Sequence, residues 1–473
     1  MSNYKESIHE NKLWYEKLPH PMALIFWILL FTYLLTLLVP SGVFQREEVN
    51  GRESVVPGTF EMVEAPLLSP LDVFFSIPQG MVSSASIIFI VFIAGGLFRL
   101  LSATKALENT VGTLIKKLGT ERQTLTVWAI TFIFGMLGVV VGYEGNIALI
   151  PLAIFVGLAL RGDLIVGLSM AVGGIGFGFA ASPVNPYTVG VSQTIADIPL
   201  FSGFGLRTVM ALVMLSIVAH HTSSYLKKIQ ASPQSSFAKG LSTQGMRLEK
   251  TLEEYCMGRV DFIVIFTFLI GLALILYGVF SLGWYINEIS GVFLAIAVIC
   301  GLLTGMKTNE MVDHLIKGAA SVTGGALIIG VARAIQVLLE QGQIGDTIIN
   351  ALAVPVAQLP LMLSSIVMTL VHGAINIFIP SGSGQAMATM PIMIPLSDII
   401  GMTRQTAILA FQIGDGFTNM ISPTSGGTLA MLALAGVPYD KWLRYALPLI
   451  VKCFIASWLF IIFAVFIGWG ASL

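Results

Sequence analysis

Uninterrupted apolar runs recur along almost the whole chain, and this feature restricts the possible fold more than any other. A bilayer core about 30 Å thick needs roughly 20 apolar residues per crossing helix. Charged residues are only 11% of the 473 residues, against about 25% in soluble proteins. The pattern predicts an all-α polytopic membrane protein and excludes a large soluble enzyme, a nucleic-acid binder and a disordered scaffold. The expected membrane spans are residues 22–40, 82–103, 201–225, 260–281, 286–306, 319–340 and 445–470.

Two other apolar stretches, 124–160 and 361–399, are too long for a single crossing. Each has a glycine-rich interruption near its middle, at Gly142–Asn146 and at Pro380–Gln385. The arms on either side are about 14–19 residues long, which is short for a crossing. We therefore interpret both stretches as re-entrant hairpins, which enter and leave the membrane on the same side.

The two halves of the chain carry related segments. The segment Gly142–Pro151 aligns with Gly382–Pro391, which lies 240 positions further along the chain. The same offset relates stretches 164–198 and 404–435, both of which are apolar but interrupted by proline and glycine. A constant offset across a hairpin and the following helix is unexpected by chance, so we predict a repeat in which each half has one hairpin and one broken helix.

Lysine and arginine in the short loops orient the chain, because cytoplasmic loops carry an excess of them. They are frequent after the second span, in the polar central segment and before the last span. Loop 41–75 is instead rich in glutamate, and loop 341–360 has no lysine or arginine. This distribution predicts a cytoplasmic N-terminus and an external C-terminus, in a bacterial cytoplasmic (inner) membrane.

With this orientation the first hairpin opens from the cytoplasm and the second from outside, so the repeat is inverted. Residues 1–228 are the first repeat, 229–259 a cytoplasmic linker, and 260–473 an extra helix plus the second repeat. Inverted repeats with broken helices are typical of secondary transporters, whose site lies at the midplane. The chain has no zinc-protease or serine-hydrolase motif, so we expect no enzyme; a channel is the alternative from another class.

Two prolines lie inside the apolar segment Ser182–Thr188. Proline removes a backbone donor and clashes with the preceding turn, so the helix must open there. The freed carbonyl groups need partners at membrane depth, and Ser182, Asn185 and Thr188 supply further oxygen atoms. A bound cation would use these oxygens, whereas the alternative is a kink stabilised by neighbouring hydroxyls. The related segment Ser422–Thr428 favours a cation site.

Two acidic side chains are expected at membrane depth, Glu144 at the first hairpin tip and Asp415 before the second break. A carboxylate inside the bilayer is costly, and it marks a functional site by default. Both are flanked by glycines, which allow a ligand to approach closely. Asn146 and Asn419 add amide groups nearby. The alternative interpretation is an internal ion pair with Arg333, which lies deep in its span.

The second hairpin tip presents the polar side chains of Ser381, Ser383 and Gln385. A loop at membrane depth must line a cavity or be buried in protein. This requirement favours a binding site over a flexible glycine/serine loop. His372, in the first arm of the same hairpin, is either a hydrogen-bonded packing residue or a proton relay, since histidine titrates near neutrality.

These motifs resemble the YfcC family, which is grouped with the C4-dicarboxylate anaerobic carriers (DcuC-like) in the ion transporter superfamily. The resemblance covers essentially the whole chain. It implies a homodimer whose protomers each have a scaffold and a transport domain, with elevator-type motion. It also implies that two hairpin tips and two unwound helices enclose substrate and coupling-ion sites. The motifs that carry it are Leu38–Phe44, Gly142–Gly145, Ser182–Tyr187, Asp415–Asn419 and Ser422–Gly426.

Relatives of this family include arginine/ornithine exchangers and carriers of dicarboxylates and other organic anions. A dicarboxylate calls for arginine, lysine or converging N–H groups, which helix N-termini at the tips could supply. A basic amino acid calls for carboxylates such as Glu144 and Asp415, and we expect this substrate. The alternative is sodium- or proton-coupled transport of a C4-dicarboxylate. Sodium or a proton is the expected coupling ion, and we expect no other cofactor.

The expected partners are a small-molecule substrate, the lipid bilayer and a second copy of the chain, and no nucleic acid. The side chains expected to bind substrate are Glu144, Asn146, Asn185, Ser381, Ser383, Asp415, Asn419, Thr424 and Ser425. Those expected to bind sodium are Asn146, Ser182, Thr188, Ser422 and Thr428.

Overall fold

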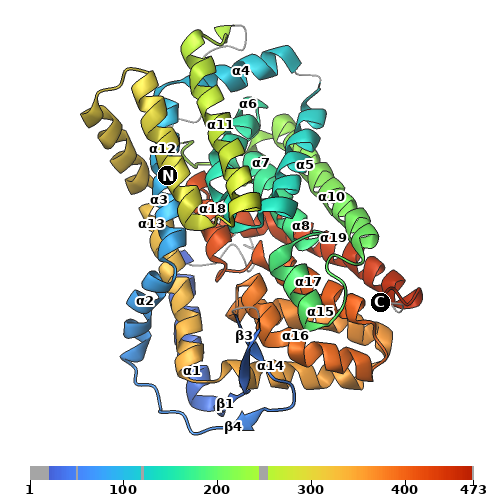
Figure 1. The fold of residues 1–473 in the computed structure, drawn as a ribbon. Coiled ribbons are helices and arrows are strands. Elements are labelled where there is room, and N and C mark those ends of the chain that lie inside the picture. Colours follow the sequence, from blue (N-terminus) through green and yellow to red (C-terminus); the bar gives the residue numbers. More distant parts are fainter. Residues whose placement is uncertain (1–20, 50–51, 119–121, 244–253, 471–473) are drawn as a thin grey trace, which may run out of the picture.

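The described part of the chain is mostly helical (Figure 1). The computed structural model describes residues 21–49, 52–118, 122–243 and 254–470. Six of the helices in these residues are long and apolar enough to cross a membrane. They are α3 (Ala85–Ala103), α10 (Phe204–Ala231), α12 (Ile286–Leu303), α13 (Thr308–Gln341), α15 (Leu361–Phe378) and α19 (Tyr439–Phe466). Two further expected spans are also helical, as α1 (Pro21–Leu38) and α11 (Arg259–Leu282).

The expectation of an all-α chain is wrong for the loop that follows α1. This loop contains four short strands in two antiparallel pairs. They are β1 (Gly42–Val43) with β4 (Glu61–Met62), and β2 (Arg46–Val49) with β3 (Arg52–Val55). The loop has no long apolar run whose burial would hold a helix, so its backbone groups pair between strands instead. Shorter helices not expected from the sequence are α2 (Asp72–Ser83), α4 (Ala106–Leu118) and α14 (Gly345–Ala353).

Both over-long apolar stretches are divided near the expected positions. The first contains α5 (Gln123–Val141), a 3-10 turn (Glu144–Leu149) and α6 (Ile150–Ala159). The chain turns between them at Gly142, whose φ of +95° favours glycine. The second contains α15 and α16 (Gly382–Ile399). In Figure 1 α5 and α6 lie in the upper half of the molecule, and α15 and α16 lie in the lower half.

The two helices expected to be broken are also interrupted. The first consists of α7 (Leu164–Leu168), a π-helical turn and α8 (Gly174–Ala180), and resumes after the break with a second π-helical turn and α9 (Val191–Ile195). The second consists of α17 (Arg404–Asn419) and α18 (Gly426–Ala435).

The interrupted helices pack closely because small residues lie where they cross. A Cβ placed on Gly416 of α17 would lie 2.3 Å from the Cβ of Ala180. A Cβ on Gly178 of α8 would lie 2.0 Å from the carbonyl oxygen of Gly135 in α5. The rings of Phe177 and Phe417 meet edge to face with centroids 4.8 Å apart. Such small-residue crossings are how membrane helices approach one another.

The long helix α13 packs against α1, α2 and α3 on one side and against α18 on another. Glycines again permit these contacts: a Cβ on Gly95 of α3 would lie 2.8 Å from the carbonyl oxygen of Gly318. A Cβ on Gly325 of α13 would lie 2.0 Å from the Cβ of Ala433 in α18. Helix α13 therefore joins the first helices of the chain to the second broken helix.

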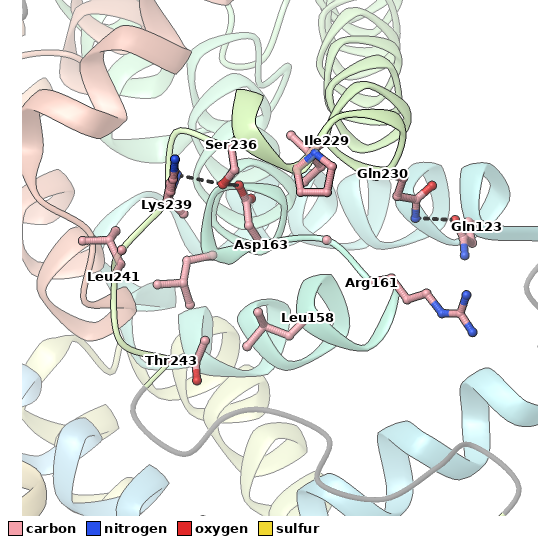
Figure 2. A pocket seen from close by; sticks show the side chains of 15 residues that line it. Gln123, Leu158, Arg161, Asp163, Ile229, Gln230, Ser236, Lys239, Leu241 and Thr243 are labelled. Atoms are coloured by element: carbon pink, nitrogen blue, oxygen red, sulfur yellow. Dashed lines mark hydrogen bonds between the residues drawn. The ribbon is translucent and has the colours of Figure 1, made fainter.

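The central polar segment lies against the start of the first broken helix. The expected linker begins within α10, which continues to Ala231, and its residues 244–253 lie outside the described residues. Asp163, at the N-terminus of α7, accepts hydrogen bonds from the hydroxyls of Ser236 and Tyr225, each 2.6 Å long. A cavity of about 610 Å³ lies beside these contacts, and Figure 2 shows Ser236 and Asp163 on one wall.

Three predictions about the architecture remain predictions. They are the domain boundaries, the inverted relation of the two halves and the elevator motion.

Candidate functional site

A cavity of about 80 Å³ lies where the two hairpin tips meet the two helix breaks. The first tip contributes Glu144 and the second tip contributes Ser381 and Ser383. Asn419 and Ser425 line it from the two sides of the second break. The structure thus brings together five of the side chains that the sequence predicts to bind substrate, from segments far apart in the chain.

The first tip is held in place by hydrogen bonds at its base and at its end. Asn146 is buried and donates from its Nδ2 to the carbonyl oxygen of Gly142, at 2.6 Å. Its amide therefore closes the tip and does not line the cavity. Tyr143 and Thr428 share a 2.7 Å hydrogen bond between their hydroxyls, which ties the tip to α18. Glu144 Oε2 accepts a 3.0 Å hydrogen bond from the hydroxyl of Tyr285.

At the first break, polar side chains are used by the backbone. The side-chain oxygen of Asn185 accepts from the backbone N–H groups of Tyr187 (2.8 Å) and Thr188 (3.3 Å), which caps the helical segment that follows. The hydroxyl of Ser182 donates to the carbonyl oxygen of Val139 at 3.1 Å. These two side chains thus stabilise the break, as the proline-kink alternative requires. The Oγ1 of Thr188 is buried and has no hydrogen-bond partner among the described residues.

The second break is held in a similar way. Thr424 donates to the carbonyl oxygen of Ile377 at 2.7 Å and shares a 2.7 Å hydrogen bond with Ser422. Ser425 caps α18 by accepting from the backbone N–H of Thr428 at 3.4 Å. Of this group only Ser425 lines the cavity.

Asp415 is fully buried directly behind the second tip. A Cβ placed on Gly382 would lie 3.3 Å from Asp415 Oδ2 and 2.7 Å from the Cγ2 of Thr188. The two side chains therefore both lie next to Gly382, which itself lines the cavity. Neither carboxylate oxygen of Asp415 has a hydrogen-bond partner in the described part of the chain. Most buried polar groups in proteins are hydrogen-bonded, so these oxygens are candidates for a ligand.

The sequence left open an ion pair of Arg333 with either acid, and Asp415 forms no such pair. Arg333 lies near enough to Glu144 to attract it electrostatically, but no salt bridge joins them among the described residues. The guanidinium of Arg333 donates to the side-chain oxygen of Gln336 on its own helix. The ring of His372 packs against Phe411, and its Nδ1 lies 3.4 Å from Gln385 Nε2, whereas its Nε2 is buried without a hydrogen-bond partner among the described residues.

Sequence reasoning missed several polar residues around the site. Asn376, buried in α15, donates from its Nδ2 to the carbonyl oxygen of Asp415 (3.0 Å), to Thr418 Oγ1 (2.9 Å) and to Asn419 Oδ1 (2.9 Å). Arg207 and Tyr285 were also passed over. An arginine within the expected span 201–225 was a signal that could have been used, because charges inside spans are rare.

Comparison with known proteins assigns the chain to a family. The family model for "C4-dicarboxylate anaerobic carrier" (DcuC) matches residues 18–466. The chain is 28% identical to a protein of Escherichia coli (strain K12) named "Putative basic amino acid antiporter YfcC", over 96% of this chain and 97% of that protein. It is 27% identical to an uncharacterized protein of Haemophilus influenzae, over 85% of this chain and 80% of that protein.

Two solved transporter structures are also similar to this chain, at 17% identity each. The YdaH transporter of Alcanivorax borkumensis gives a TM-score of 0.44, with 95% of this chain and 99% of that chain covered. MtrF of Neisseria gonorrhoeae, described as one of a class of antimetabolite efflux pumps, gives a TM-score of 0.42, with 95% and 96% covered. The match to the family model extends over nearly all of the sequence, and it agrees with the apolar helices. The chain therefore belongs to the C4-dicarboxylate anaerobic carrier family and is a membrane transporter, not an enzyme.

Proposed function

We propose that this carrier is a secondary active transporter of a basic amino acid in a bacterial cytoplasmic membrane, and that it works by an elevator mechanism. The observation that carries the proposal is a pair of acidic side chains at the meeting point of tips and breaks. Glu144 lines the small cavity, and Asp415 lies behind Gly382 with both oxygens unpartnered. A buried carboxylate without a counter-charge is costly, and a cationic substrate would supply that charge.

Aromatic rings next to Glu144 support a cationic ligand. Tyr143, Phe179, Tyr187 and Tyr285 all line the cavity. The rings of Tyr187 and Tyr285 have centroids 6.0 Å apart, and those of Tyr143 and Phe179 are 5.8 Å apart. Aromatic faces attract guanidinium and ammonium groups. We therefore place the cationic side chain of the substrate at this end of the cavity.

Two helix N-termini that reach the cavity are candidate partners for the carboxylate of an amino acid. Helix α16 begins at the second tip, with Ser381 as its N-cap, and α18 begins at Gly426 with Ser425 as its N-cap. Helix N-termini carry free N–H groups and a partial positive charge, which bind carboxylates. Both caps line the cavity.

The cavity is small for the proposed substrate, so in this proposal the tips part to admit it. About 80 Å³ holds several water molecules, whereas pockets for small ligands are usually about 300–1,000 Å³. A larger cleft of about 680 Å³ lies on the other side of the second tip, and Ser381 and Ser383 line both spaces. Displacement of this tip would join the cleft to the cavity. Arg46 and Asp346 lie in the outer cleft, where they form a 2.9 Å salt bridge.

The coupling ion in this proposal is sodium or a proton. Among the side chains expected to bind sodium, Thr188 Oγ1 and Asn146 Oδ1 are buried without a hydrogen-bond partner among the described residues. Thr188 is the one that lies next to Asp415. Its neighbour Asp415 supplies the carboxylate that either ion would need. A homodimer with a cytoplasmic N-terminus and an external C-terminus completes the proposed arrangement.

Transport of a C4-dicarboxylate is the second candidate, because the family model is described by that substrate. A dicarboxylate needs compensation for two negative charges. Within the described residues no lysine or arginine lines the small cavity, and Glu144 would repel such a ligand. The charge at the site therefore favours a basic amino acid.

Uptake of labelled arginine and succinate into proteoliposomes separates the two candidates. We expect wild-type protein to take up arginine, and Asp415→Asn to abolish this uptake with folding preserved. Asp313→Asn is the matched control, because Asp313 is an exposed carboxylate paired with Lys317. Robust succinate uptake without arginine uptake in wild type would replace the first candidate with the second.

A further inference from the structure

A fully buried arginine lies beside the first helix break, outside the cavity. Arg207, near the start of α10, has no solvent-exposed surface. Its Nη1 donates to Gln405 Oε1 (2.9 Å) and to the carbonyl oxygen of Ser202 (3.0 Å), and its Nε donates to Gln412 Oε1 (3.1 Å). The ring of Trp469 covers the guanidinium at 4.9 Å. Each of these partners is neutral, and in the described part of the chain no carboxylate forms a salt bridge with the guanidinium.

Burial of a charge without a counter-ion disfavours folding, and an apolar residue of similar size is often more stable in such a place. A purely structural role therefore explains Arg207 poorly. What a guanidinium does well is to fix the direction of its acceptors, because its N–H groups form a rigid planar fork. Gln412, on α17, is the acceptor whose orientation affects the first helix break.

Gln412 connects the arginine to the break. Its Oε1 faces Arg207, so its Nε2 must point the opposite way, where it donates to the carbonyl oxygen of Ser182 at 2.7 Å. In a continuous α-helix that carbonyl would accept from the N–H four residues later. That position is Pro186, which has no N–H. The amide of Gln412 therefore replaces the donor that the proline removes.

We propose that Arg207 and Gln412 form a clamp that positions the first break for transport. Arg207 acts as a positioning residue: it orients Gln412, and Gln412 holds the carbonyl group of Ser182. The fixed carbonyl sets where Asn185 and Thr188 lie, one turn further along. The clamp rests on the transporter assignment and not on which substrate is carried.

The distinguishing variants place a carboxylate next to Arg207 in two ways. Gln412→Glu gives the guanidinium a charged partner but removes the donor to Ser182. Gln405→Glu gives it the same partner and leaves that donor intact, because Gln405 donates to Ser202 Oγ. A structural role predicts that the two variants behave alike, whereas the clamp predicts that they differ.

Two measurements decide between these outcomes. We expect Gln405→Glu to unfold at or above the wild-type temperature and Gln412→Glu to remain folded. Only Gln412→Glu should raise the KM of the transported substrate, by about tenfold for one lost hydrogen bond at the break. The second measurement needs no substrate: the rate at which a maleimide labels Val184→Cys in a Cys256→Ser background should increase with Gln412→Glu alone. Equal KM values and equal labelling rates in the two variants would overturn the clamp. Absence of arginine uptake by wild type would instead count against the proposed substrate, and labelling would still test the clamp.

Discussion

Substitution of Gly382 by alanine tests whether the second tip must close against the first break. A Cβ at this position would lie 2.7 Å from the methyl carbon of Thr188, 3.3 Å from Asp415 Oδ2 and 3.4 Å from the ring of Phe179. Contacts below 3.0 Å require movement. Thr188 and Asp415 are both fully buried, so they have no free space into which to move. The second tip must therefore move away from them, which opens it.

The magnitude follows from the cost of one extra methyl group in a packed site. Overpacking costs about 1–3 kcal/mol. This penalty raises the free energy of the closed state only, because the clash arises only when the tip is closed on Thr188. Each 1.4 kcal/mol is a factor of ten in an equilibrium constant, so the closed state should become roughly 5- to 140-fold less populated relative to the open state. Alanine also favours helix over glycine by up to about 1 kcal/mol, and the control variant shares this effect.

Concentration-dependent uptake in proteoliposomes measures the effect as an increase in KM. The control is Gly205→Ala in the first turn of α10, where a Cβ would have no other heavy atom within 4 Å. It adds the same methyl group without a clash, so Gly205→Ala should remain close to wild type. Equal KM values in the two variants would refute the argument that the closed tip is the binding-competent state.

The remaining predictions concern the first tip, the outer cleft and the topology. Tyr285→Phe removes the hydrogen bond to Glu144 and should weaken substrate binding by about 0.5–1.5 kcal/mol, measured as a 2- to 13-fold rise in KM; an unchanged KM would show that this contact is absent during transport. Asp346→Ala leaves the backbone N–H of Phe44 and the guanidinium of Arg46 without their acceptor and should lower the free energy of unfolding by about 1–3 kcal/mol in a denaturant titration, with no loss counting against the pairing. Arg161→Cys, in the turn between α6 and α7, should react with an impermeant maleimide only from the cytoplasmic side. Reaction from outside would contradict the re-entrant first hairpin.

The helical architecture was accessible from the sequence because the membrane imposes a length on each apolar run. The same reasoning located the interruptions near Gly142 and Pro380, since an apolar run too long for one crossing must turn. The strands after α1 were not accessible. They depend on Asp346, which holds the backbone N–H of Phe44 from the far half of the chain at 3.0 Å. No local pattern encodes such a contact.

The sequence was enough to predict which polar residues lie at the candidate site, but less so what each side chain does there. Asp415 and Glu144 were identified because carboxylates at membrane depth are costly, and both lie at the meeting point of tips and breaks. Asn185 and Ser182 were expected to bind ligands, and the Asn185 side-chain oxygen and the Ser182 hydroxyl also serve the interrupted backbone. The side-chain nitrogen of Asn185 has no hydrogen-bond partner among the described residues. Which polar group binds a ligand depends on which backbone groups the fold leaves unpaired. Which backbone groups stay unpaired depends on tertiary contacts. Arg207 is a second example, because its partners Gln405 and Gln412 come from the other half of the chain.

The near-contact between α5 and α8 has an evolutionary consequence. The carbonyl oxygen of Gly135 occupies the space where a side chain at Gly178 would begin, and a Cβ at Gly138 would lie only 2.2 Å from the carbonyl oxygen of Ile175. Backbone atoms cannot be exchanged for smaller ones by mutation. Neither glycine can therefore acquire a side chain unless the two helices move apart, and a change at a distant position cannot restore the fit. Among divergent homologues these positions should keep glycine long after the polar residues of the site have changed with substrate.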